Sequence, residues 1–271
     1  MADLRVLTLN LWGQRGAWEE RRSLLISGLR ELQPDLIAFQ ESMVTDTYDQ
    51  ILDLLGGNYH ITHHHIREPD GQGISVASRW PLNDVHEVDL QISARTADFA
   101  GTALITEIRV PGPVGPLIFI NHCPNWQSDF EFEREQQAVL TARVVEEFVG
   151  ERSIHVVLAG DLTATPETAN VRFWRGLQSL GGMSVCYKDV WERTHPDEHG
   201  HTFSPRNPLR SERWLLDLGR RIDYIFIRCG HTSPTLDVTA CALAFDQPVD
   251  EVWASDHFGV IADFAVPTPS P

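Results

Sequence analysis

Apolar, strand-like segments that end at a polar residue recur along this chain, and they constrain its fold more than any other feature. Three of them, LRVLTLN, LIAFQE and VVLAGD, end at Asn10, Glu41 and Asp161, and a fourth, LIFINH, ends at His122. Segments that are apolar on both faces are typical of central strands in a sheet covered on both sides. We therefore expect a sheet whose edge collects these polar side chains.

Helix-like segments alternate with these strands. The segment AWEERRSLLISGLRELQ places apolar residues and Arg22 at helical spacing, and FEFEREQQAVLTARVVEEFV is a second amphipathic helix. Two later strands carry acids near their starts, because Asp223 opens RIDYIFIR and Asp256 and His257 precede the strand in SDHFGVIADFAV. In a mixed sheet the start of one strand can lie beside the end of another, so all these groups can meet at one edge.

Length and composition suit one large domain or two small ones, because the chain has 271 residues, of which 42% are apolar. We expect a single domain over residues 1–271 with a frayed tail at 266–271. We find no internal repeat, no targeting leader and no apolar segment of membrane-spanning length, so a cytoplasmic protein is the expectation. Four cysteines without a CxxC pair predict reduced core residues.

The net charge of the chain limits the kinds of partner that it can bind. There are 38 acidic and 22 basic residues, with Lys188 the single lysine, and the formal net charge is −16. Such a chain repels polyanions at long range, which weakens the case for a protein that coats nucleic acid. It does not exclude a nuclease that binds one phosphate at a metal site.

The carboxylates Glu41, Asp161, Asp223 and Asp256 are the candidate chemical groups. A single acid at a strand end is most often a turn former or a helix cap. Four in one cleft raise one another's pKa values and require a cation, and oxygen ligands favour Mg²⁺ or Mn²⁺. A metal beside a histidine suits phosphoryl transfer, with Asp223 orienting His257.

Seven motifs, in order along the chain, resemble the exonuclease–endonuclease–phosphatase superfamily, whose fold is that of pancreatic deoxyribonuclease. They are LTLNLWG, DLIAFQES, GQGISVASRWP, INHCPNW, VVLAGDLTATPET, RIDYIFIR and SDHFGVIADF, and they extend over roughly residues 4 to 266. The resemblance implies an α/β, four-layer sandwich of two mixed β-sheets flanked by helices. The superfamily includes DNA-repair nucleases, deadenylases, sphingomyelinases and inositol-phosphate phosphatases, so the substrate stays open.

The resemblance also implies a metal site and a catalytic pair. Asn10 and Glu41 would hold Mg²⁺, or Mn²⁺, with Asp256 beside it or at a second metal position. His257 would contact the scissile phosphate, and Asp161 would position or deprotonate the attacking water.

A further set of roles follows from INHCPNW and the helix after it. His122 would bind a phosphate oxygen, and Asn125 is a nearby candidate donor. Arg134 and Gln137 match a helix pattern that we interpret as structural. Trp126 is a rim aromatic or a core residue. Four other tryptophans are expected mainly in the core, namely Trp12, Trp18, Trp174 and Trp191. Three adjacent histidines, His63 to His65, alternate faces in a strand and are not expected to bind a metal.

Thr163 departs from the family's usual run of Gly-Asp-x-Asn, because it stands where the asparagine would be. A planar amide is replaced by a single, shorter hydroxyl. Three interpretations stay open: Thr163 donates through its hydroxyl, the substrate is placed so that no donor is needed, or the site is weakened or non-catalytic.

The segment HTFSPRNPLRSERWLLDLGRR, residues 201–221, is a candidate substrate loop. Phe203 would stack on a ring or base, Arg206 would bind a second anionic group, and Asn207 would add a polar contact. A solvated loop with ion pairs is the alternative.

Together these features predict a magnesium-dependent hydrolase of phosphate esters, a phosphodiesterase or phosphatase, whose substrate is a phosphorylated small molecule. A DNA or RNA nuclease of the same superfamily is the alternative. A phosphate-binding relative without activity is the alternative from another class, because of Thr163. No protein partner can be inferred.

Overall fold

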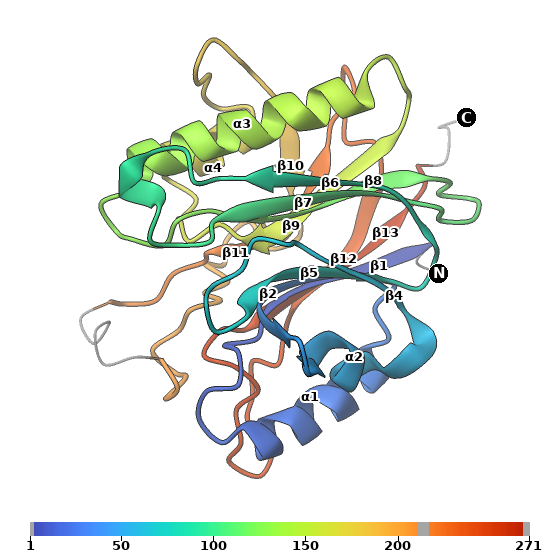
Figure 1. Ribbon diagram of the computed structural model, residues 1–271. Coiled ribbons are helices and arrows are strands. Elements are labelled where there is room, and N and C mark those ends of the chain that lie inside the picture. The colour runs from blue at the N-terminus through green and yellow to red at the C-terminus, as the bar shows by residue number, and fades with distance from the viewer. Residues whose placement is uncertain (1–2, 211–216, 268–271) are drawn as a thin grey trace.

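The computed structural model describes residues 3–210 and 217–267, in which helices and strands form four layers (Figure 1). Trp214, in the candidate substrate loop, and most of the expected tail lie outside the described residues. The first sheet has the strand order β12-β13-β1-β2-β5-β4, with β3 paired to β2. Its strands are β1 (Leu4–Asn10), β2 (Leu36–Thr45), β3 (Tyr48–Asp49), β4 (His60–His63), β5 (Gln72–Ser78), β12 (Asp237–Ala244) and β13 (Gly259–Ala265).

The second sheet has the order β10-β11-β9-β8-β7-β6. Both sheets are mixed, because β1 and β2 are parallel, as are β8 and β9, whereas their other neighbours are antiparallel. The strands of the second sheet are β6 (Leu82–Asp89), β7 (Thr102–Ile108), β8 (Leu117–Cys123), β9 (His155–Asp161), β10 (Tyr187–Asp189) and β11 (Asp223–Arg228).

The helices cover the outer faces of the two sheets (Figure 1). Helices α1 (Trp18–Leu32) and α2 (Gln50–Leu55) pack on the first sheet, and α3 (Glu131–Val149) and α4 (Ala169–Trp174) pack on the second. The short α5 (Val190–Thr194) contacts β11 and β12. One apolar cluster fills the space between the sheets, and one lies under each helical layer. The predicted four-layer α/β sandwich is confirmed.

One edge of the sandwich collects the strand ends that the sequence singled out. Strands β1, β2 and β9 run toward this edge, and β11 and β13 start from it because they are antiparallel to β9 and β1. Asp223 therefore lies in register with Asp161, and Asn10 lies in register with Gln40.

Buried polar side chains tie the two sheets together below this edge. Gln40 of β2 donates from Nε2 to Oδ1 of Asn121 on β8, at 2.8 Å. The Asn121 amide then donates to the carbonyls of Phe39 (2.8 Å) and Ser75 (2.9 Å). Because an unpaired buried amide is costly, this network favours one alignment of the sheets.

Helix α1 buries an arginine beside the one that the helical repeat includes. Arg21 is almost completely buried, whereas Arg22 is half-buried and forms an ion pair with Asp53. Both residues fit a helical repeat, so the repeat alone does not distinguish them. The buried position is set by four backbone carbonyl oxygens that surround the Arg21 guanidinium.

The cysteines and tryptophans are only partly in the core. Cys123 and Cys241 are buried, but Cys186 is exposed and Cys229 is intermediate. Trp174 and Trp191 are buried as expected, whereas Trp12 is half-buried at the surface. Among the described residues, no helix combines the length and the apolar character needed to cross a membrane.

Candidate active site

Three of the predicted residues form a compact buried cluster at the shared edge. Nδ1 of His257 lies 3.0 Å from Oδ2 of Asp223 and 4.0 Å from Oδ2 of Asp161. Asp223 lies at the start of β11, Asp161 at the end of β9, and His257 in the turn before β13. The structure thus brings together three residues that are far apart in the sequence.

The charge state of His257 is set by its acidic neighbours. Burial alone would lower the pKa of the imidazole, but the negative charge and hydrogen bond of Asp223, followed by the charges of Asp161 and Asp256, raise it well above its ordinary value. His257 is therefore an imidazolium at neutral pH, fixed by Asp223 and available as a cation.

For Asp161, burial is the largest effect on the pKa. Burial raises the pKa of its carboxyl to about 7, and the charge of Asp223 adds to this effect. Asn10 donates to its Oδ2 at 3.1 Å, and the Thr163 N–H donates to its Oδ1 at 2.8 Å, so the carboxylate is fixed in direction. A positioned carboxylate with a pKa near neutrality is suited to accept a proton from water.

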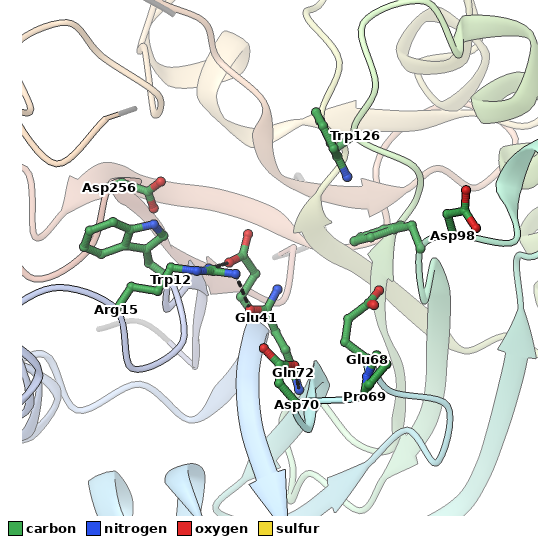
Figure 2. Close-up of a pocket in the computed structure, with 11 residues that line it drawn as sticks. Trp12, Arg15, Glu41, Glu68, Pro69, Asp70, Gln72, Asp98, Trp126 and Asp256 are labelled. Atoms are coloured by element: carbon green, nitrogen blue, oxygen red, sulfur yellow. Dashed lines mark hydrogen bonds and ion pairs between the residues drawn. The ribbon is translucent and has the colours of Figure 1, made fainter. Parts of the chain in front are cut away.

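Glu41 and Asp256 provide a second pair of carboxylates. Both line a cleft of about 590 Å³ at the same edge (Figure 2). Burial raises the pKa of Asp256 to about 6, and the charge of Glu41 contributes to that increase. Oε2 of Glu41 accepts from Arg15 at 2.6 Å, and Oε1 accepts from Asn10 at 3.1 Å.

This donor set fits a hard divalent cation. Glu41 and Asp256 offer carboxylate oxygens, and among the described residues that line the cleft Arg15 is the one basic residue. Asn10 directs its amide nitrogen to Glu41 and Asp161, while its Oδ1 accepts the Trp12 N–H at 2.9 Å. Because the Asn10 amide is bonded to Glu41 and Asp161, Glu41 and Asp256 are the main candidates for holding a cation.

Arg21 supports this site from below. Its guanidinium donates to the carbonyls of Leu11 and Arg15 (2.6 Å for the latter) in the loop after β1. It also donates at 3.0 Å to the carbonyl of Ala254, two residues before Asp256. One buried cation therefore holds the loop of Arg15 and the turn of Asp256 together.

The side chain of Thr163 is bonded to backbone carbonyls within the protein. Its hydroxyl lies 2.8 Å from the carbonyl oxygens of both Asn125 and Leu162, and its backbone N–H fixes Asp161. Its φ of 54° is a left-handed conformation, which is uncommon for a β-branched residue. The hydroxyl holds the loop, and this supports the interpretation in which the substrate needs no donor from residue 163.

Asn125 is also engaged within the protein. Its Oδ1 accepts from Gln137 at 2.6 Å, and its Nδ2 donates to Gln127 at 3.2 Å. Arg134 donates to its carbonyl at 3.1 Å. The structural roles predicted for Arg134 and Gln137 agree with these contacts, and Asn125 is a completely buried residue whose side chain is bonded within the loop.

His122 does not reach the site, which corrects the sequence interpretation. Its ring lies on the outer face of β8, edge-on to Trp174 of α4 and with Nδ1 3.3 Å from the Thr141 hydroxyl of α3. Burial lowers its pKa to about 3. Successive strand residues face opposite sides, so Cys123, and not His122, belongs to the inner face next to Asp161.

The expected substrate loop packs against the turn that carries Ser255 and His257. The Phe203 ring packs on His257 at 5.0 Å between centroids, and Asn207 donates to the Ser255 carbonyl at 2.7 Å. Both residues are buried, so Phe203 offers no open face for stacking. Arg206 is exposed, lies 3.9 Å from Asp246, and does not line the cleft.

Ser255 is a positioning residue that the sequence did not reveal. Its hydroxyl donates to the Asn10 carbonyl at 2.7 Å and receives the His257 N–H at 3.2 Å. It therefore joins the end of β1 to the turn that carries His257. A serine before Asp-His gives no signal by itself, because its partner lies 245 residues away.

The adjacent histidines have separate partners. His63 contacts Ser75 and Asp49, while His64, His65 and Glu87 offer ligand atoms within 4.8 Å of one another. Nδ1 of His64 already accepts the Ile66 N–H, and Nδ1 of His65 is bonded to Glu87. His64 is buried and His65 is exposed, so this group spans the surface and the interior of the protein.

Solved structures share this architecture. The D. rerio TDP2 complex with a single-strand DNA product has a TM-score of 0.73 at 23% identity, covering 97% of this chain and 99% of that one. The human Nocturnin catalytic domain with bound sulfate has a TM-score of 0.72 at 18% identity, with coverage of 97% and 93%. These likenesses define the class of fold, a four-layer α/β sandwich.

The sequence itself defines the family. The model of the endonuclease/exonuclease/phosphatase family matches residues 7–257, and the chain belongs to this family. A Drosophila melanogaster protein named "Putative neutral sphingomyelinase" is 26% identical over 283 aligned positions, which include 97% of this chain. The chain spans 60% of the length of that relative.

Proposed function

We propose that this protein is a divalent-metal-dependent phosphodiesterase, most active on a small phosphodiester. The observation that carries the proposal is the buried cluster of Asp161, Asp223 and His257, which lies at the same sheet edge as the carboxylates of Glu41 and Asp256. Such a cluster combines a base, an oriented cation and a cation site, the three elements that attack of water on phosphorus requires.

Each residue has a defined task in this proposal. Asp161, with a pKa of about 7, accepts the proton of the attacking water. The imidazolium of His257 contacts a non-bridging phosphate oxygen and stabilises the charge that develops there. Asp223 keeps the ring of His257 oriented and protonated.

The cation would be held by Glu41 and Asp256 with Asn10 beside it, and Mg²⁺ or Mn²⁺ suits these oxygen donors. When bound, it supplies charge neutralisation at the phosphate and the leaving oxygen. Arg15 forms an ion pair with Glu41 in the structure, so a bound cation would either share the Glu41 carboxylate with Arg15 or displace Arg15 from it.

The acidic cleft is the reason to favour a small substrate over nucleic acid. Within residues 3–210 and 217–267, Glu68, Asp70 and Asp98 line it in addition to the two candidate ligands, and Arg15 is the one arginine that does. A polynucleotide normally meets several Lys and Arg side chains. The name of the Drosophila melanogaster relative supports a small or lipid phosphodiester.

A nuclease remains the second candidate, because the structure of D. rerio TDP2 holds a single-strand DNA product. Trp126, which is 45% exposed at the cleft, provides a surface on which a base could stack. The third hypothesis, a phosphate-binding protein without activity, receives less support, because the Thr163 hydroxyl bonds to the Asn125 carbonyl and its N–H bonds to Asp161.

The proposal is tested with bis-p-nitrophenyl phosphate, assayed with Mg²⁺, with Mn²⁺ and with EDTA. We expect metal-dependent release of p-nitrophenol that is lost in Asp161→Ala. An active protein is then compared on small phosphodiesters, phosphomonoesters and single-stranded DNA. Equal turnover by wild-type protein and Asp161→Ala would reject the proposed site, and faster turnover of DNA would favour the nuclease.

A further inference from the structure

The cleft has two chemically different ends (Figure 2). We call the inner end the part formed by Trp12, Arg15, Glu41 and Asp256, and the outer end the part formed by Glu68, Asp70, Asp98, Phe99 and Trp126. In Figure 2, Trp12 and Asp256 lie on one side of Glu41, and Trp126 and Asp98 lie on the other. A phosphate bound beside Glu41 would therefore direct one of its ester groups toward the outer end.

The outer end keeps uncompensated negative charge. Glu68 accepts the Ala100 N–H at 2.6 Å, and Asp70 accepts the Gln72 N–H at 3.0 Å, but within residues 3–210 and 217–267 none of its three carboxylates forms an ion pair. Arg15, the basic residue of the cleft, is bound to Glu41 and Gln72 at the inner end. A cation entering the outer end would be attracted by all three acids.

Aromatic faces accompany these acids. Trp126 is 45% exposed on the loop after β8, and Phe99 is half-buried in the loop before β7. An exposed tryptophan beside carboxylates is a poor fit for a polyanion but a good one for an alkylammonium group, because the ring face attracts a weakly hydrated cation. Apolar methyl groups on such a cation would also cover the indole.

We infer that the outer end binds an alkylammonium group of the substrate, such as a choline-like or ethanolamine-like ester of the scissile phosphate. This inference rests on the proposed function, because it assigns the part of the substrate that adjoins the reacting phosphorus. The product that stays in the cleft would be an alkylammonium phosphate monoester. A cationic ester also offsets the repulsion between an anionic phosphodiester and the acidic cleft.

The reaction balances without a further reagent. The water oxygen forms a bond to phosphorus, and the P–O bond to the other ester group breaks. One water proton passes to Asp161 and then to solvent, the other stays on the new phosphate hydroxyl, and the leaving oxygen takes up one proton from solvent. The alkylammonium group takes no part in the bond changes, so it determines which substrate is bound and not how it reacts.

The test compares two esters of the same shape. Choline and 3,3-dimethylbutanol differ only in a charged nitrogen in place of a carbon, so their p-nitrophenyl phosphodiesters separate charge from size. With the full chain and Mg²⁺, we expect kcat/KM to be about tenfold higher for the choline ester. Calorimetric titration with phosphocholine and with 3,3-dimethylbutyl phosphate should show the same preference in Kd.

Variants of the outer end locate the effect. Trp126→Ala and Asp98→Asn should each reduce the ratio between the two esters, whereas Asp84→Asn should leave it unchanged. Asp84 is a matched control because it is an exposed aspartate on β6 that does not line the cleft.

Equal kcat/KM and equal Kd for the two compounds would overturn the inference, as would a ratio that neither Trp126→Ala nor Asp98→Asn changes. Tighter binding of an oligothymidylate than of phosphocholine would also overturn it. Preferential binding of phosphocholine without hydrolysis of bis-p-nitrophenyl phosphate would instead retain the outer end and reject the proposed function.

Discussion

The inner cluster and the outer end of the cleft are acidic in different ways. Asp161 and Asp223 are buried on neighbouring strands and bonded to fixed partners, whereas Asp70 and Asp98 are exposed on loops. Burial raises the pKa of Asp161, whereas burial lowers the pKa of His257 and its acidic neighbours raise it. In our proposal, the sheet edge therefore positions the reacting groups, and the loops above it select the substrate.

The largest expected effect is that of His257→Ala on catalysis. Loss of the imidazolium removes the cation that contacts the phosphate, and kcat should fall about 10²–10⁴-fold on any phosphodiester. Steady-state rates at saturating Mg²⁺ measure this fall, with Asp84→Asn as the control. A fall of less than about threefold would break the division between the two regions, because the buried cluster would then not be the reacting part.

Arg21→Leu tests whether the inner end depends on the buried guanidinium of Arg21. Several carbonyl oxygens would lose their donor, so the free energy of unfolding should fall by about 2–4 kcal/mol. Urea denaturation measures the loss. Arg22→Leu is the matched control on the next residue of α1, and its loss should be smaller because Arg22 is only half-buried and pairs with Asp53. Equal losses in the two variants would contradict the role of Arg21.

Asp161→Asn sharpens the electrostatic part of the comparison. The folded-state pKa of Asp161, about 7, is above its ordinary value of 3.8, so ionisation of this carboxyl opposes folding. Below pH 4 the effect is absent, and it increases as pH rises to about 7. The variant should therefore gain stability over wild type as pH rises from 4 to 7, in urea denaturation with EDTA. A constant difference across this range would show that Asp161 is not perturbed.

The smallest effect is expected for Thr163→Asn. Asparagine tolerates a left-handed backbone better than threonine, so the variant should be about 1 kcal/mol more stable. Activity should change less than threefold, because the Thr163 hydroxyl bonds to backbone carbonyls. Thermal denaturation and steady-state kinetics measure both quantities. A rise in kcat of tenfold or more would instead show that the native site is a weakened one.

The strand ends were predictable from the sequence, and the residues between them were not. Asn10, Asp161 and Asp223 lie at the ends of their strands as predicted. Glu41 was expected to end its strand as well, but β2 continues to Thr45 beyond a register shift between Phe39 and Ser42. His122 was assigned wrongly because the two faces of a strand differ by one residue, and the sequence alone did not decide which residue, His122 or Cys123, lay inward.

Other features depend on contacts that no local pattern records. Arg21 and Arg22 both fit the helix repeat, and the surrounding carbonyls decide which one is buried. The outer end joins the loops of Glu68, Asp98 and Trp126, which only the folded arrangement of the two sheets brings to one cleft.

The most direct test of the division between chemistry and selectivity is the ratio of kcat/KM for the choline ester to that for the 3,3-dimethylbutyl ester, measured in Asp223→Asn and in Asp98→Asn. Asp223→Asn should lower both rates by the same factor and leave the ratio at its wild-type value, because it acts through His257. Asp98→Asn should lower the ratio. A ratio that falls in Asp223→Asn, or that is unchanged in Asp98→Asn, would contradict the assignment of the two regions.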